Sequence, residues 1–201
     1  MRRRAVSILA ILLAGAAPEA WSQVRGFPLY AVPVPRGITL AADVAFASDD
    51  FCPGTCAGVG VAGGFGRVGM SASVATSGYG GLVTLSLLPA GPRPFHLVLQ
   101  GGAAGTASGG LFQAPFGTGF SVWIPTPVVS LQAWVGFRGQ YMNPGNGWEG
   151  DGAVHVGLSA GLGFTLLNGL GVRAAYDRVF IANNNLSTFG VGVFFSFDTG
   201  L

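Results

Sequence analysis

The sequence has few charged residues and no lysine. Only 9% of its 201 residues are charged, whereas an ordinary soluble domain has about 25%. Such a chain lacks the polar surface that keeps a globular domain in water. Beyond residue 22, seven arginines balance seven acidic residues. This balance gives no indication of a basic nucleic-acid-binding surface, and we predict no nucleic-acid partner.

Cysteine is also scarce, because Cys52 and Cys56 are the only two in the chain. They lie close together between two strand-like runs. In an exported chain this spacing suits a small disulfide-closed loop better than a metal site, which needs more ligands nearby. We therefore predict a disulfide between Cys52 and Cys56. No phosphate-binding loop or cofactor motif occurs, and we predict no metal and no other cofactor.

The N-terminus has the features of an export signal. Three arginines after Met1 precede the apolar run from Ala5 to Ala17, and Ala20 and Ser22 provide a small-residue cleavage site. An uncleaved anchor helix is the alternative, but this run is short for crossing a bilayer. We predict a signal peptide over residues 1–22, an extended lead-in over residues 23–36 and one domain over residues 37–201.

Glycine is abundant, with 35 residues, and most of the chain alternates large apolar residues with small or polar ones. The run from Leu186 to Phe197 shows the pattern, with Phe194 as the large residue on its small parity. Its apolar parity comprises Phe189, Val191, Val193, Phe195 and Phe197. A period of two is typical of a strand with one apolar face. Roughly ten such runs occur, each near the length of a tilted membrane-spanning strand.

The predicted connections alternate between short and long. Those near residues 67, 91, 126 and 168 are short. Those near residues 52, 110, 147 and 182 are long, and two of them are predicted to run from Gly105 to Pro115 and from Asn143 to Gly152. The connection near Tyr79 is a short member of the long set. This alternation and an even strand number are typical of a closed barrel across an outer membrane. We predict an all-β, closed antiparallel up-and-down transmembrane β-barrel of about ten strands, in which Leu186–Phe197 pairs with Gly37–Ala47. Eight strands is the alternative, since the runs Met70–Ser77 and Leu82–Leu88 are weak.

Two other folds compete with this prediction. A helical membrane protein would use the apolar stretch from Ala153 to Val172, which contains the small residues Gly157 and Gly161 at helix-packing spacing. Frequent glycine and proline disfavour long helices. A soluble exported β-barrel that binds an apolar ligand would need its polar face outside, and that face carries few charges.

The signal peptide, the alternating runs and the aromatic last strand resemble the small outer-membrane β-barrel proteins of Gram-negative bacteria, the class of OmpA-like and OmpX-like barrels. The resemblance covers Gly37 to Phe197. In that family the barrel-assembly machinery reads a last strand that ends in an aromatic residue. The five apolar residues of Leu186–Phe197 match this assembly signal, but Asp198 to Leu201 follow them. The resemblance implies location in the cell outer membrane, contact with its lipid and recognition by the assembly machinery.

Several polar side chains fall on the small parity, which would face the barrel lumen. The candidate lumen network comprises Asp43, Gln132, Arg138, His155, Arg173 and Asp177. Unpaired charges in a narrow interior are costly, so we expect the charged members to meet opposite charges or water. A selectivity ring of a small pore is the alternative. Because side chains largely fill a barrel of eight to ten strands, we predict a plugged lumen, with Trp134 as part of the plug.

No catalytic residues are predicted. His155 and Ser159 share a strand face but lie about 13 Å apart along it, which is too far for a base and its nucleophile. We therefore predict a non-enzymatic barrel with a structural, surface-interaction or narrow-pore role, and keep a lipid-modifying barrel enzyme as an alternative. The acidic loop residues are interpreted as solvated charges and not as a cation site; they are Asp49, Asp50, Glu149 and Asp151.

Overall fold

The structure, a computed structural model, describes residues 37–47, 54–76, 78–88, 94–106, 111–144, 152–166, 168–181 and 186–197. Ten strands occupy these ranges. They are β1 (Gly37–Ala47), β2 (Gly54–Phe65), β3 (Val68–Ala75), β4 (Gly78–Ser86), β5 (Phe95–Thr106), β6 (Leu111–Pro125), β7 (Val129–Pro144), β8 (Ala153–Leu166), β9 (Leu170–Phe180) and β10 (Leu186–Phe197). The predicted signal peptide, the lead-in, Cys52 and the four acidic loop residues lie outside the described residues.

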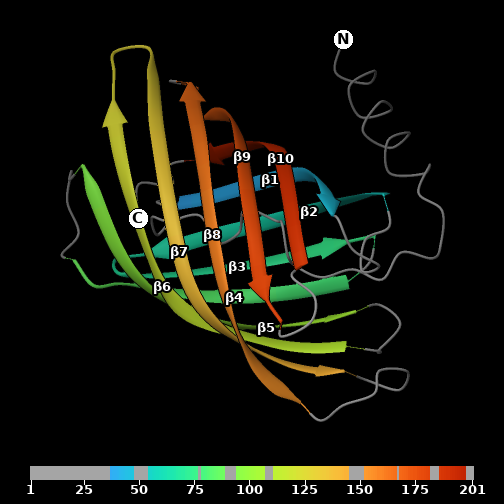
Figure 1. Cartoon of the computed structure of the whole chain (residues 1–201). Helices are drawn as coiled ribbons and strands as arrows, with labels where there is room; N and C mark the ends of the chain where they lie inside the picture. Colours follow the sequence, from blue (N-terminus) through green and yellow to red (C-terminus); the bar gives the residue numbers. More distant parts are fainter. Residues whose placement is uncertain are drawn as a thin grey trace.

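The strands form one closed barrel in which every strand pairs antiparallel with its neighbours in the chain. The barrel closes where β1 pairs with β10, in a register that places Ile38 opposite Phe197 and Phe46 opposite Phe189. Figure 1 shows the chain colours running around the wall until the blue β1 lies beside the red β10. The predicted all-β up-and-down fold, its ten strands and its closing pair are confirmed, and the alternative of eight strands is wrong.

Two tight turns at one end of the barrel use glycine in a left-handed backbone conformation. Gly66 has φ +60° in the β2–β3 turn, and Gly169 has φ +83° in the β8–β9 turn. Residues other than glycine rarely adopt this backbone conformation, so glycine at these two positions favours the hairpins. The Gly169 amide also donates to the Leu166 carbonyl at 2.9 Å. Strand β1 begins and β10 finishes at this same end of the barrel, which we call the short-turn end. The opposite end is the loop end.

Several predicted boundaries are wrong. The break near Tyr79 lies inside β4, because Gly78 already pairs with Ala75. The predicted loop from Gly105 to Pro115 is shorter, since β5 continues to Thr106 and β6 begins at Leu111. The strand β7 also extends into the predicted loop after Asn143. In each case, pairing with an adjacent strand prolongs a strand through glycine, alanine or proline residues of low strand propensity.

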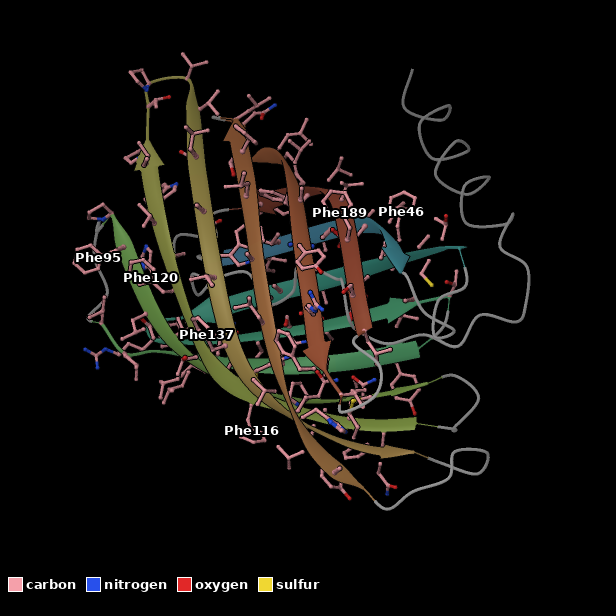
Figure 2. All side chains as sticks on the ribbon, viewed as in Figure 1. Phe46, Phe95, Phe116, Phe120, Phe137 and Phe189 are labelled. Carbon is pink, nitrogen blue, oxygen red and sulfur yellow. The ribbon has the colours of Figure 1, made fainter. Side chains whose placement is uncertain are left out.

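The outer wall of the barrel is apolar on all ten strands. Large side chains of the apolar parity stay exposed, with Phe65 at 77% as the extreme case. Figure 2 shows the labelled phenylalanines pointing away from the wall, and they are Phe46, Phe95, Phe116, Phe120, Phe137 and Phe189. The small and polar parity faces the interior. The barrel is therefore inside out relative to a water-soluble protein, whose large apolar residues fill the core.

The stretch from Ala153 to Val172 is not helical. It contains β8 and the first residues of β9. These two strands pair antiparallel, beginning with Thr165 opposite Gly171 next to the turn. Across the part of the chain that the structure describes, no helix has the length and apolar character needed to cross a membrane. The alternative prediction of a helical span in this stretch is wrong, because its alternating residues pair as two strands.

Candidate functional site

The most buried ion pair of the interior joins Arg138 of β7 to Asp177 of β9. The two terminal guanidinium nitrogens donate to the two carboxylate oxygens at 2.5 and 2.7 Å, and the side chains are only 5% and 3% exposed. Strand β8 lies between these strands. Gly157 of β8 sits opposite Arg138, and a Cβ atom there would lie 3.0 Å from the guanidinium carbon. The missing side chain of Gly157 lets the arginine reach across β8.

Two glutamines extend this pair toward the loop end. The Nε of Arg138 donates to Oε1 of Gln140 at 3.0 Å, and Nε2 of Gln140 donates to Oε1 of Gln113. Both amides are buried. The arginine thus has three of its donors satisfied by side chains, as burial of a charged group requires. We call Arg138, Asp177, Gln140 and Gln113 the central network.

A second ion pair of the same design lies on the adjacent part of the wall and shares strand β9 with the first. Arg173 of β9 donates through Nε and a terminal nitrogen to the carboxylate of Asp43 of β1, at 3.0 and 2.7 Å. Strand β10 separates the two, and Gly192 lies opposite both residues in register. A Cβ atom at Gly192 would lie 1.8 Å from Oδ1 of Asp43. Phe194 adds a ring whose centroid is 5.7 Å from the Arg173 guanidinium carbon.

The two pairs leave the described interior electrically balanced. Each pair places one guanidinium on one carboxylate with two parallel hydrogen bonds, the geometry that best offsets the cost of removing charges from water. Removing one partner of such a pair would leave a buried charge without compensation. The arrangement therefore fits a structural cross-brace better than a charge-selective ring.

The other two candidate residues of the lumen lie inside but outside these pairs. Gln132 is partly buried, and its Nε2 atom is buried without a hydrogen-bond partner among the described residues. His155 lies opposite Gln140 in register and is half-buried. His155 and Ser159 both face inward on β8, four residues apart. The structure thus brings four of the six candidates together as two pairs.

An apolar cluster near the loop end was missed by the sequence analysis. Met142, Val179 and Leu186 are buried against one another, and Ile181 packs on them. These residues lie just beyond the central network along β7, β9 and β10. The first residue of β10, Leu186, is a large side chain on the small parity, and this exception to the alternation was the available signal. The cluster packs on the inner wall next to the ion pair, on its loop-end side.

A large ring, that of Trp134, also lies in the interior toward the short-turn end. Trp134 is 5% exposed, and its ring covers Gly161 of β8, where a Cβ atom would lie 2.0 Å from the ring. A small cavity with a volume of about 10 Å³ lies beside the central network, and its lining includes Gln100, Pro115 and Ser159. That volume holds about one water molecule. At these positions side chains pack closely against the inner wall.

The apolar side chains of the predicted assembly signal, on β10, point outward from the barrel wall. Phe189, Val191, Val193 and Phe197 are exposed, and Phe195 packs edge-on against Phe197 with ring centroids 4.5 Å apart. Phe194 points inward, as its parity requires. Cys56 is buried on the inner face of β2. Its predicted partner Cys52 lies outside the described residues, so their disulfide stays a prediction. Within the described ranges no three potential metal ligands gather.

No family model and no curated protein matches the sequence. Solved structures of similar shape include the KdgM porin in complex with disordered oligogalacturonate, with 12% identity and a TM-score of 0.46 over 79% of this chain and 99% of that one. The outer membrane enzyme PagL has 11% identity and a TM-score of 0.45 over 79% and 99%. The N-terminal β-barrel domain of Pseudomonas aeruginosa OprF has 14% identity and a TM-score of 0.39 over 79% and 97%.

Proposed function

We propose that this protein is an integral β-barrel of the bacterial outer membrane with a closed interior, and that it serves a structural or surface-interaction role. One observation carries the proposal: exposed large apolar side chains encircle the barrel on all ten strands. Each costs free energy in water in proportion to its exposed apolar area. Lipid removes that cost, and a closed barrel leaves no unpaired strand edge in the membrane.

The interior supports a lumen filled by side chains more than an open pore. The central network projects into the lumen from β6, β7 and β9, and the cluster of Met142, Val179 and Leu186 packs beside it near the loop end. Any narrow-pore role would require these groups to move. We therefore place function at the outer wall and the connections of the loop end, while the ion pairs hold the wall in shape.

The proposal includes the predicted route to the membrane. Residues 1–22 direct export, an oxidising compartment closes the disulfide between Cys52 and Cys56, and the barrel-assembly machinery recognises β10. The exposed phenylalanine and valine side chains of β10 support its role as the assembly strand, because they form one continuous apolar face.

We also propose that the barrel is not an enzyme. His155 and Ser159 are four residues apart on one face of β8, which corresponds to about 13 Å along a strand. A general base must approach its nucleophile to about 3 Å. Arg138 and Asp177 satisfy each other, so neither is poised to act on a substrate.

Cell fractionation combined with gel mobility tests the proposal. The protein is expected in the outer-membrane fraction and to run faster on a cold detergent gel than after boiling, because a closed barrel resists the detergent until it is heated. Circular dichroism in detergent should show strand structure. Recovery of the folded chain from the supernatant without detergent would contradict membrane insertion and favour a soluble barrel.

A further inference from the structure

One arginine of β9 points away from the paired charges. Asp177 faces inward to Arg138, so the next residue, Arg178, projects from the outer wall. Of the charged side chains within the described strands, it alone lies on the outward parity. No carboxylate of the described residues forms an ion pair with it. A charge on a lipid-facing wall is stable when a group of opposite charge or a polar headgroup lies beside it.

Neighbouring side chains hold this arginine in place. Its guanidinium carbon lies 5.3 Å from the centroid of the Phe180 ring, a cation–π distance. Ser187 lies opposite it on β10 and accepts a hydrogen bond from the Tyr176 hydroxyl at 3.0 Å. The Nε atom of Arg178 is buried without a hydrogen-bond partner among the described residues. A guanidinium held against an aromatic ring is suited to a ligand with several acceptor oxygens.

The position along the strand sets the depth of this site in the membrane. Arg178 is two residues before Phe180, the last residue of β9 at the loop end. Two residues correspond to about 7 Å along a strand. A long arginine side chain can bridge such a distance and place its charge at the headgroup level, while its stem stays among apolar groups.

We propose that Arg178 binds the phosphate of an anionic lipid in the leaflet around the loop end. The inference rests on the proposed membrane location. The guanidinium matches a phosphate in charge and in paired donor geometry. Toward the membrane centre, its outward neighbours Tyr176 and Leu162 are exposed side chains with large apolar surfaces, against which the acyl chains of the same lipid pack. The ligand is thus an anionic phospholipid or another phosphate-bearing lipid, held by its headgroup.

Native mass spectrometry of the barrel purified from membranes in detergent tests the site. The probes are phosphatidic acid and phosphatidylcholine with the same acyl chains, and the variant is Arg178→Gln. We expect the wild type to retain phosphatidic acid better than phosphatidylcholine, and the variant to retain it about fivefold less, the effect of one basic residue at an anionic membrane surface. Equal retention by wild type and Arg178→Gln would overturn the proposal.

Three controls make the result specific. Arg67→Gln removes the same charge from an exposed turn at the opposite end, and an equal loss in that variant would show general charge attraction and overturn the site. Displacement of the lipid by an equal concentration of inorganic phosphate would overturn the choice of a lipid. Arg178→Gln should keep the cold-gel mobility of the wild type, which shows that it folds. If the wild type itself is absent from the outer membrane, the proposed location fails independently of lipid binding.

Discussion

Removal of Arg138 should strongly destabilise the barrel. The change Arg138→Met keeps the stem volume but deletes the guanidinium, so the carboxylate of Asp177, which is 3% exposed, loses both of its hydrogen bonds from that group. Breaking a buried ion pair by removal of one partner costs about 3–5 kcal/mol. Solvent screens this pair little because both side chains are buried. We therefore expect the free energy of unfolding to fall by about 3–5 kcal/mol.

A double variant separates the pair from general damage to the wall. Replacing both partners, as in Arg138→Met with Asp177→Leu, removes the uncompensated charge. Such replacements of a buried pair by apolar residues are often close to neutral, so the double variant should lie within about 2 kcal/mol of the wild type. The matched control is Arg67→Met, an exposed turn arginine, which should change stability by no more than about 0.5 kcal/mol.

The measurement is guanidinium chloride unfolding of barrels refolded in lipid vesicles, followed by tryptophan fluorescence and checked by cold-gel mobility. The wild type, Arg138→Met, Asp177→Leu and the double variant form a mutant cycle that gives the coupling energy of the pair directly. A loss below about 1 kcal/mol for Arg138→Met would mean that water already solvates the pair. In that case the packed interior, and with it the closed-lumen proposal, would be refuted.

Three further predictions concern packing, passage and the cysteines. Gly161→Ala should destabilise the barrel by about 1–3 kcal/mol in the same unfolding assay, because its Cβ atom would overlap the Trp134 ring; Gly63→Ala, where the nearest heavy atom is 3.6 Å away, is the neutral control, and equal effects would contradict the packing. The purified barrel should carry no steady current across a planar bilayer, and stepwise conductance would show an open lumen. The unfolded, unreduced protein should take up no alkylating reagent, and two equivalents after reduction; uptake before reduction would exclude the disulfide of Cys52 and Cys56.

The alternation of residues was sufficient to predict the barrel and its closing pair. A strand exposed to lipid on one face and to a packed lumen on the other must alternate, so the period of two survives throughout the chain. Boundaries failed where small residues or proline lack this contrast, as at Gly78 and Pro115. Their strand state comes from partners in adjacent strands, and no local pattern records it.

The partners inside the lumen were less predictable. Parity indicates that Asp43, Arg138, Arg173 and Asp177 face the same side, but it does not say which strands a side chain crosses. That choice depends on register around the barrel and on Gly157 and Gly192, which leave room over β8 and β10. Glycines directly opposite an arginine or aspartate in the paired register are the signal that sequence alone could not use.

The pairing of β1 with β10 has a consequence for the order of folding. Nine of the ten strand contacts join neighbours in sequence, whereas the seam joins residues such as Thr39 and Ser196, which are 157 positions apart. Local hairpins form at low entropic cost, but this seam can form only after all ten strands have been made and aligned. A partly synthesised chain therefore cannot close the barrel, because β10 is the last strand to be made. Until the seam forms, both edge strands offer unpaired backbone groups to other chains, so the interval before closure is the period of greatest aggregation risk.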